Sequence, residues 1–450
     1  MSEPSQPKRT AQTAGRQRDL KPSPAPARLP FQFTSVDPTI RREIVYHHAS
    51  DGYPLSGVLY LPPHGDADLA VLAMHPRGDF SRHYLAPPTA LGGFAFFGAT
   101  SRYLHNDADA LHERLLLDVA GSITWLKRRG FKRVVLLGNS GGCSLFSYYL
   151  EQAAKAGPVR HQTAPSGDRV PLGDFDLPLA DGFFALAAHP GEGAFLLERL
   201  DPSLVDEADP VSANPRLDMY DPKNGYVPMQ LGPSSYSADF LAEFRAAQIA
   251  RCERLDARAK SWIAEAQAHK RTLNSGEHFA GLEAREKLRV ARHSLVRRYM
   301  LIYRTLADPR YLDPKLDPSQ RPLGSIFSFG RDPIAGNYGE GLARSMSARG
   351  WLSTWSGLTS RANVLKNLPG VSCPFHLCNA LADMDIYPSE ADAMFNVVGS
   401  RDKTRSELAW ADHYLNPQGE AGGKLRDPRQ RCADEVFLPW LRERWASDAA

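Results

Sequence analysis

Gly138-Asn139-Ser140-Gly141-Gly142 is the stretch that decides the fold. Residues 132–137 before it form an apolar run typical of a buried strand, and residues 143–150 after it predict a helix. A G-x-S-x-G pattern between a strand and a helix is typical of a nucleophile elbow. The serine needs a tight, strained turn, and a Cβ at the flanking glycines would collide with the neighbouring elements. We therefore expect the hydroxyl of Ser140 to project at a helix N-terminus; the alternative is a plain glycine-rich turn.

The composition indicates one large domain with an insertion, or two domains. The chain has 450 residues, of which 42% are hydrophobic, enough for a substantial core. The net charge of +3 argues neither for nor against an anionic partner. The five cysteines are odd in number and fit no zinc-binding spacing, which predicts reduced thiols in a cytoplasmic protein.

Residues 1–30 differ from the rest of the chain. They hold six prolines and six Lys/Arg, with almost no large apolar residue, and predict a disordered tail. They contain no apolar segment of the kind found in secretory signals. No run in the chain approaches the roughly 18 apolar residues of a membrane span, so we expect no membrane partner.

Strands and helices alternate over most of the chain, which predicts an α/β sheet. The expected strands are 42–48, 55–61, 69–74, 94–100, 132–137, 182–188, 374–379 and 407–410. The expected helices of this part are 109–129, 143–150, 388–397 and 435–445.

The alternation stops after residue 191 and returns near residue 350. Between these points, apolar or small residues recur at spacings of three and four over 248–266 and again over 288–306, which predicts an antiparallel helical hairpin. Residues 245–304 hold 14 Lys/Arg against 6 Asp/Glu. This surplus is either a solvated basic face or a surface that attracts anionic substrates or an acidic partner. The hairpin also leaves a homodimer open.

A serine nucleophile needs a base, and the base needs an acid that orients it. Asp383 lies just past one predicted strand and His413 just past the last one. The carboxyl ends of parallel strands meet at one edge of a sheet, so the order Ser140, Asp383, His413 predicts a catalytic triad. The alternatives for the acid are Asp385 and, less compatible with a short loop, Asp412. His75 and His189 end strands at the same edge and are alternatives for the base.

On these motifs the chain resembles the α/β-hydrolase-fold superfamily, over roughly residues 40–190 and 350–445. The resemblance implies a mostly parallel sheet flanked by helices, with a mainly helical cap inserted after the sixth strand. It divides the chain into a tail (1–30), a first core part (31–190), a cap or lid (191–347) and a second core part (348–450). The segment 374–383 resembles the strand and G-x-x-D loop of the family, with Ala380 where glycine is usual.

The resemblance also implies an oxyanion hole made of two backbone N–H groups. The first is that of Gly141, directly after the nucleophile. The segment 75–78 is similar to the His-Gly-x loop of the family, but Pro76 has no N–H, so the second donor is expected at Arg77, with Gly78 as the alternative. The segment could also be only a turn.

Further polar residues are expected on loops at the same edge of the sheet. They are candidates for binding a substrate carboxylate, although the arginines can instead pair with Asp79, Asp107 or Asp109. The candidates are His75, Arg77, Arg82, His83, Arg102, His105 and His189.

Together these features predict a serine hydrolase that cleaves a carboxylic ester or related acyl bond of a small to medium organic substrate. We expect no cofactor, no metal cluster and no nucleic-acid partner. One alternative is the same triad acting on an amide, carbamate, thioester or carbon–carbon bond. Another is a non-catalytic binding protein that uses the pocket and the basic hairpin.

Overall fold

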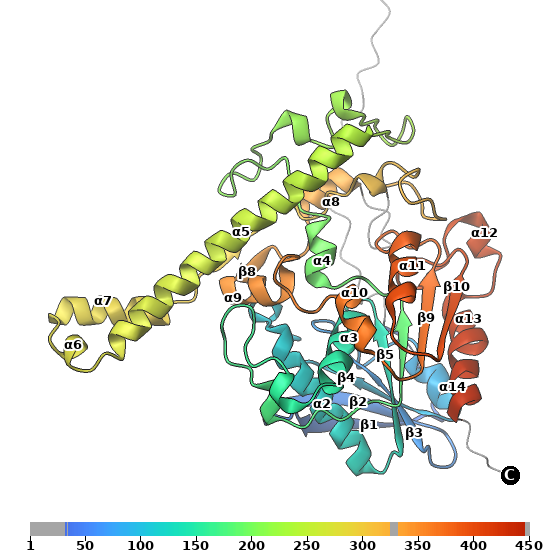
Figure 1. The fold of residues 1–450 in the computed structure, drawn as a ribbon. Helices are drawn as coiled ribbons and strands as arrows, with labels where there is room; N and C mark the ends of the chain where they lie inside the picture. The colour runs from blue at the N-terminus through green and yellow to red at the C-terminus, as the bar shows by residue number, and fades with distance from the viewer. Residues whose placement is uncertain (1–31, 34, 325–331, 446–450) are drawn as a thin grey trace, which may run out of the picture.

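The computed structural model describes residues 32–33, 35–324 and 332–445. The predicted tail, residues 1–30, lies outside the described residues. The central sheet has eight strands in the order β1-β2-β4-β3-β5-β6-β9-β10 (Figure 1). The strands are β1 (Arg41–His48), β2 (Pro54–Leu61), β3 (Leu69–Ala73), β4 (Ala95–Ala99), β5 (Arg133–Asn139), β6 (Gly182–Leu186), β9 (Phe375–Ala380) and β10 (Lys403–Leu408).

The sheet is parallel except at one side. Strand β2 runs antiparallel to both β1 and β4, and every other neighbouring pair is parallel. Strand β5, which precedes the elbow, lies between β3 and β6. This order and the helices on both faces are those of the α/β-hydrolase fold, which confirms the predicted fold class.

Alternate side chains of the buried strands pack into two separate cores. On β5, Val134 and Leu136 face one core, while Val135 and Leu137 face the other. The first core is covered by α2 (His112–Arg129), α3 (Gly142–Ala153), α10 (Val364–Asn367) and α11 (Pro388–Val397). The second is covered by α1 (Ala86–Leu91), the π-helical turn Cys432–Phe437 and α14 (Leu438–Trp445). Both faces of the sheet are therefore shielded from water, as a parallel sheet requires.

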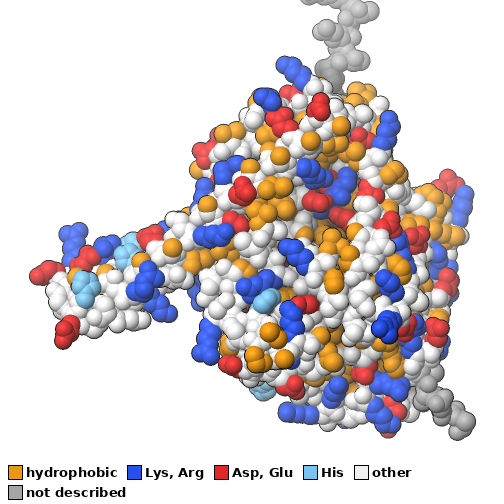
Figure 2. Space-filling view, viewed as in Figure 1, with side chains coloured by type: hydrophobic (Ala, Val, Ile, Leu, Met, Phe, Trp, Pro, Cys, Tyr) orange, Lys and Arg blue, Asp and Glu red, His pale blue; other side chains and the backbone are white. Residues whose placement is uncertain are grey.

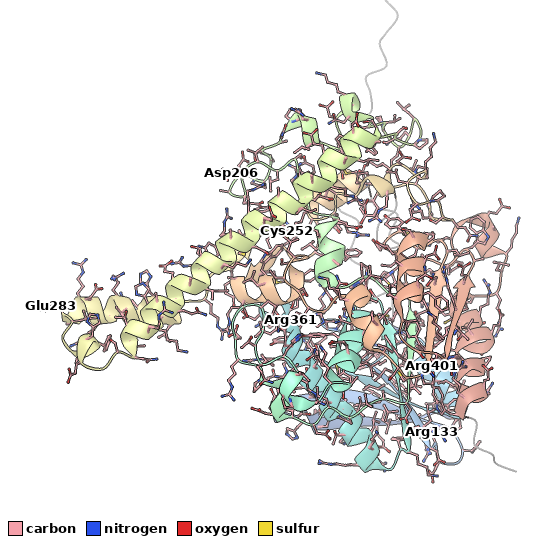
Figure 3. All side chains as sticks on the ribbon, in the orientation of Figure 1. Arg133, Asp206, Cys252, Glu283, Arg361 and Arg401 are labelled. Atoms are coloured by element: carbon pink, nitrogen blue, oxygen red, sulfur yellow. The ribbon has the colours of Figure 1, made fainter. Side chains whose placement is uncertain are left out.

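A long segment separates β6 from β9 and contains most of the remaining helices. Its elements are α4 (Glu192–Leu197), α5 (Ala238–Leu273), α6 (Glu277–Ala280), α7 (Ala284–Leu295), β7 (Tyr299–Leu301), α8 (Pro333–Gly339), β8 (Ser345–Ser347) and α9 (Ala348–Gly350). Helix α5 crosses the body beside α4, and its C-terminal part extends outward with α6 and α7 as a projecting arm (Figure 1). In Figure 3, Cys252 marks the part of α5 over the body and Glu283 the tip of the arm.

The two halves of α5 have different environments. Cys252, Leu255 and Ala259 are buried against Trp351 and Trp355, so this stripe holds the helix on the body. The arm beyond it carries basic, acidic and histidine side chains together (Figure 2). In the described part of the chain, no helix is both long and apolar enough to cross a bilayer.

The prediction of a second long helix over 288–306 was wrong. Helix α7 ends at Leu295, although it does pack against α5 as a hairpin requires. Residues Tyr299–Leu301 instead form β7, which pairs with Ser345–Ser347. Aromatic and branched residues follow one another here and favour a strand, and Met300 and Ile302 are buried beside Trp351. The apolar residues keep the spacing of three and four through β7 although this segment is not helical, so the spacing alone did not distinguish the strand from a helix.

The last strand also differs from its prediction. Strand β10 is Lys403–Leu408, whereas the last strand was expected over 407–410. The strand lies at the edge of the sheet, and its side chains other than Leu408 are partly buried or exposed, so its sequence carries no apolar run. Trp410 has a φ of 57°, in the left-handed region, which ends the extended conformation.

The inserted segment contains a buried ion pair whose loss we expect to destabilise the protein. Arg304 donates from Nε and Nη2 to Oδ2 of Asp201 at 3.0 and 2.7 Å, and each side chain is 1% exposed. Arg304→Met leaves the Asp201 carboxylate buried without its cation, at an expected cost of about 3–5 kcal/mol in the free energy of unfolding. The matched control is Lys132→Met, which breaks the exposed pair with Asp68 and should cost under about 1 kcal/mol. Equal losses in urea denaturation would contradict this prediction.

Candidate active site

The turn after β5 has the strain that a nucleophile elbow requires. Ser140 has a φ of 56°, and its N–H donates to the carbonyl of Leu186 on β6. A Cβ at Gly138 would lie 2.9 Å from the backbone of Cys143, and one at Gly142 would lie 2.7 Å from the carbonyl oxygen of Met74. Both flanking glycines are therefore needed for the close approach of strand and helix, as predicted.

Three side chains far apart in the sequence meet at this turn. Nε2 of His413 lies 2.9 Å from Oγ of Ser140, and Nδ1 of His413 lies 2.8 Å from Oδ2 of Asp383. The other oxygen of Asp383 accepts the backbone N–H groups of Asp385 and Ile386 at 2.8 and 3.0 Å. The carboxylate is thus fixed by its own loop and oriented toward the imidazole.

The alternatives for the acid and the base have other arrangements. The carboxylate of Asp412 accepts hydrogen bonds from the backbone N–H groups of Tyr414 and Asn416, so it holds the loop that carries His413. Asp385 lies near the imidazole, since its carboxylate and the ligand atoms of Asp383 and His413 are all within 4.8 Å of one another. It is nevertheless Asp383 that accepts the hydrogen bond donated by Nδ1 of His413.

The environment of His413 strengthens its basicity. Burial by itself lowers the pKa of the imidazole, but the charge of Asp383 and its hydrogen bond outweigh burial and raise the pKa to about 9. An imidazole with this partner can take the proton of Ser140 and hold it while charge develops on the substrate.

The loop after β3 does not place the Arg77 amide as the sequence suggested. The backbone N–H groups of Arg77 and Gly78 both donate to Nδ1 of His75, at 3.2 and 2.8 Å. The guanidinium of Arg77 pairs with Asp107 at 3.2 Å and lies over the ring of Trp355. For Gly141, no hydrogen bond of the backbone N–H is found among the described residues, so this predicted donor is available.

The structure places four further candidates outside the cluster around Ser140, whereas His189 lies with His75 beside Gly141. Arg102 is bound by Asp51 and Asp118 at 2.7 and 2.6 Å and its side chain is only 4% exposed. Arg102 therefore pairs with carboxylates, as the alternative interpretation predicted. Its partners are not among the three that were suggested, which were Asp79, Asp107 and Asp109. The remaining three candidates are Arg82, which donates to the Phe33 carbonyl, His83, which is buried against Asn139, and His105, which is exposed.

Glu192, which the sequence analysis did not single out, lies directly beside the elbow. Its side chain is 2% exposed, and Oε2 lies 2.8 Å from Oγ of Ser144 in the first turn of α3. A Cβ at Gly141 would lie only 2.4 Å from Oε1. Burial raises the pKa of Glu192 to about 7. One feature of the sequence could have indicated Glu192. It lies just past the predicted strand that ends near His189, and so at the same edge of the sheet as Ser140.

The raised pKa of Glu192 predicts a dependence of stability on pH. The carboxyl ionises near pH 4.5 in the unfolded chain but near pH 7 in the folded protein, so the folded state binds the extra proton and the free energy of unfolding falls as pH rises through this window. The side chain of the Glu192→Gln variant cannot ionise. The free energy of unfolding of this variant, measured relative to the wild type, should therefore rise by about 3 kcal/mol as the pH goes from 4 to 8. Urea denaturation across this range measures the difference, and a difference independent of pH would contradict the assignment.

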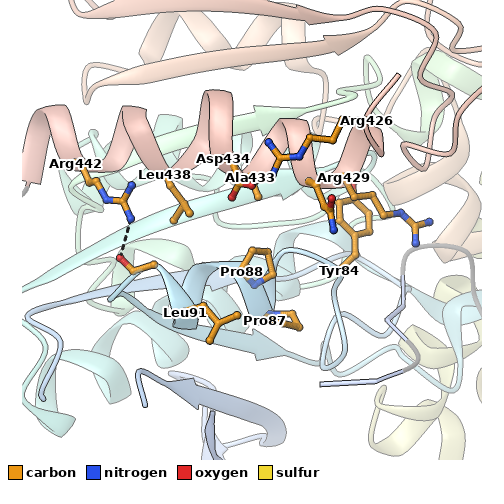
Figure 4. Close-up of a pocket in the computed structure, with 12 residues that line it drawn as sticks. Tyr84, Pro87, Pro88, Leu91, Arg426, Arg429, Ala433, Asp434, Leu438 and Arg442 are labelled. Atoms are coloured by element: carbon orange, nitrogen blue, oxygen red, sulfur yellow. Dashed lines mark hydrogen bonds and ion pairs between the residues drawn. The ribbon is translucent and has the colours of Figure 1, made fainter. Parts of the chain in front are cut away.

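A separate groove lies between α1 and α14, on the face of the sheet that these two helices cover (Figure 4). It has a volume of about 650 Å³, and Arg442 at its end donates to the carbonyl of Gly92. Its walls include Tyr84, Pro88 and Leu438. They do not include Ser140 or the two residues in its hydrogen-bonded chain, His413 and Asp383. The groove is therefore distinct from the candidate active site.

Comparison with known proteins finds similarity in structure alone. No family model matches the sequence, and no curated protein matches it. Among solved structures, the esterase domain of a Rhodothermus marinus protein has 11% identity and a TM-score of 0.41, covering 90% of this chain and 98% of its own. An α/β hydrolase from Penicillium sp. sh18 has 12% identity and a TM-score of 0.43, covering 90% and 99%. A monoacylglycerol lipase from Paleococcus ferrophilus has 14% identity and a TM-score of 0.38, again covering 90% and 99%. Values this low carry no information on the substrate of the chain.

Proposed function

We propose that this protein is a serine hydrolase that cleaves a carboxylic ester or related acyl bond through an acyl-enzyme on Ser140. The observation that carries the proposal is the unbroken chain of hydrogen bonds from Oγ of Ser140 through His413 to Asp383, at 2.9 and 2.8 Å. The strained backbone of Ser140 supports it, because this conformation costs free energy that a plain turn would avoid.

In the proposed reaction Oγ of Ser140 attacks the carbonyl carbon while Nε2 of His413 accepts the hydroxyl proton. Asp383 stabilises the imidazolium that forms, and the N–H of Gly141 donates to the oxyanion. His413 then gives the proton to the leaving alcohol, and the acyl group remains on Ser140. A water molecule deprotonated by the same imidazole releases the acid and restores the serine.

The inserted segment supports a small to medium organic substrate. The segment between β6 and β9 also includes the π-helical turn Trp351–Trp355. This turn packs beside the loop after β3, since the guanidinium of Arg77 lies 4.9 Å from the ring centroid of Trp355. The hydroxyl of Ser353 accepts the N–H of His112 at the start of α2. We expect a segment packed over this side of the site to favour a compact acyl group over a folded polymer.

The test is turnover of a series of p-nitrophenyl esters of increasing acyl length, with the matched p-nitroanilides beside them. We expect hydrolysis of at least the short or medium esters. Inactivity on every ester, with turnover of an anilide, thioester or diketone, would replace the ester by another bond while keeping the triad. Inactivity on all of them, with unimpaired ligand binding by a Ser140→Ala variant, would instead indicate a binding protein.

A further inference from the structure

Two imidazoles lie on the oxyanion side of Ser140 with no role in the mechanism above. We propose that His75 and His189 donate N–H hydrogen bonds from Nε2 to the oxyanion, and that with the N–H of Gly141 they form the oxyanion hole in place of the Arg77 amide. This inference rests on the proposed function, because it names the groups that stabilise its tetrahedral intermediate.

The hydrogen bonds of His75 fix which ring nitrogen carries the proton. Nδ1 lies 3.2 Å from the backbone nitrogen of Arg77 and 2.8 Å from that of Gly78, and both of these groups can only donate. Nδ1 is therefore the acceptor, and in the neutral ring the proton lies on Nε2. These two bonds occupy the N–H groups of both Arg77, the expected second donor, and Gly78, its alternative.

His189 is fixed in the same way just past β6, on the other side of β5 from His75. Its Nδ1 accepts the backbone N–H of Gly191 at 3.0 Å, which again leaves the proton on Nε2. Gly191 has a φ of 117°, and a Cβ there would lie 2.1 Å from the carbonyl oxygen of Ala362. The turn that orients the ring therefore tolerates no other residue at Gly191.

The two Nε2 atoms converge beside the residue that follows the nucleophile. A Cβ at Gly141 would lie 2.9 Å from Nε2 of His75 and 3.0 Å from Nε2 of His189. Within the described part of the chain neither Nε2 has a hydrogen-bond acceptor, the nearest carboxylate contact being 4.0 Å from His189 to Glu192. Two N–H donors thus lie close to Gly141, whose own amide faces the oxyanion. The oxyanion is the oxygen on the carbonyl carbon that becomes bonded to Oγ of Ser140.

Both rings stay uncharged near neutral pH, as such donors require. Burial, followed by the positive charge of Arg77 and by His413, lowers the pKa of His75 well below its usual value. Burial, followed by the neighbouring His75 and His413, does the same for His189. A neutral imidazole donates its hydrogen bond without competing with His413 for the proton of Ser140.

Glu192 completes the electrostatics of this side of the site. Its Oε1 is the third atom that a Cβ at Gly141 would meet, and an ionised carboxylate there would repel an oxyanion. Burial favours the protonated form of Glu192 below about pH 7. We therefore describe Glu192 as a positioning residue: it packs against Gly141 and contacts Ser144, and it need not touch the substrate.

Paired substitutions separate the donor from the structural role of each ring. Asparagine can keep an acceptor near the position of Nδ1 while it removes the Nε2 donor, and glutamine places an N–H near the position of Nε2. We expect His75→Asn and His189→Asn each to lower kcat on a p-nitrophenyl ester by about 10²- to 10³-fold with little change in KM. His75→Gln and His189→Gln should recover at least about tenfold of that loss. The control is His48→Asn, an exposed imidazole on β1, which should leave kcat unchanged.

A trifluoromethyl ketone labelled with ¹³C at its carbonyl carbon gives a readout that a merely structural role would not move. It forms a tetrahedral adduct with a reactive serine, and the ¹³C shift titrates with the adduct hydroxyl. Loss of a donor should raise the pKa of that hydroxyl in both asparagine variants. If the asparagine variants keep at least half of the wild-type kcat and the adduct pKa is unchanged, the assignment of His75 and His189 to the oxyanion hole is wrong. The proposed function is not affected by that result. A wild-type protein that forms no adduct and hydrolyses no ester would overturn the proposed function instead.

Discussion

Ser140→Ala is expected to lower kcat for ester hydrolysis by about 10⁶-fold, to the level given by substrate binding and the oxyanion donors alone. The reason is geometric: the Ser140 hydroxyl lies 2.9 Å from Nε2 of His413, and the backbone of Ser140 is held in the left-handed region. Alanine has no group to form the acyl-enzyme, whereas the surrounding hydrogen bonds of the turn are made by the backbone and persist. KM should change much less than kcat.

The matched control for this substitution is Ser147→Ala. Ser147 is a buried serine of α3 whose hydroxyl donates to the backbone carbonyl of Ser144 and takes no part in the proposed chemistry. This variant should hydrolyse the same ester within a few fold of the wild-type rate. A Ser140→Ala protein that keeps more than about one per cent of the wild-type kcat would mean that another group is the nucleophile.

Asp383→Asn is expected to lower kcat by about 10⁴-fold. An asparagine at this position preserves the shape of the side chain, but it donates where His413 needs an acceptor and so favours the wrong tautomer. The charge of Asp383 is also the main cause of the raised pKa of His413, which is about 9 in the wild type. The acidic limb of the pH profile of kcat/KM, which we expect to reach half of its plateau near pH 9 in the wild type, should move to lower pH in the variant.

The sign of that shift follows from the role of the imidazole as a base. Below its pKa, His413 is protonated and cannot accept the serine proton, so the rate rises with pH until His413 is neutral. Asp385→Asn is the comparison, because Asp385 lies nearby without bonding to Nδ1. A larger loss in Asp385→Asn than in Asp383→Asn, or a limb that stays in place in Asp383→Asn, would show that the acid has been assigned wrongly.

The core of the fold was predictable because its strands are buried on both faces. Strand β5 and the strands beside it appear in the sequence as nearly continuous apolar runs, and Gly130 and the elbow glycines mark where elements end. The edge strand β10 has no such run, since its side chains are only partly buried. The prediction of a helix through Tyr299 was wrong because a helical spacing does not exclude a short strand where residues that favour strands follow one another, as they do at Tyr299–Leu301.

The candidate site was predictable to the extent that it depends on strand order. Ser140, Asp383 and His413 each follow a strand of the parallel sheet, and the fold alone brings the ends of these strands together. The oxyanion side depends instead on which acceptor a loop amide finds. That the Arg77 N–H would be taken by its own neighbour His75 is set by backbone dihedrals, which carry no pattern in the sequence.

Labelling of the folded wild-type protein with a fluorophosphonate, followed by peptide mapping, tests the central claim most directly. The account predicts one covalent adduct, located on Ser140, which forms in the native protein and is absent from the urea-unfolded protein and from Ser140→Ala. A native protein that resists the reagent, or that carries the adduct on a residue other than Ser140, would contradict it.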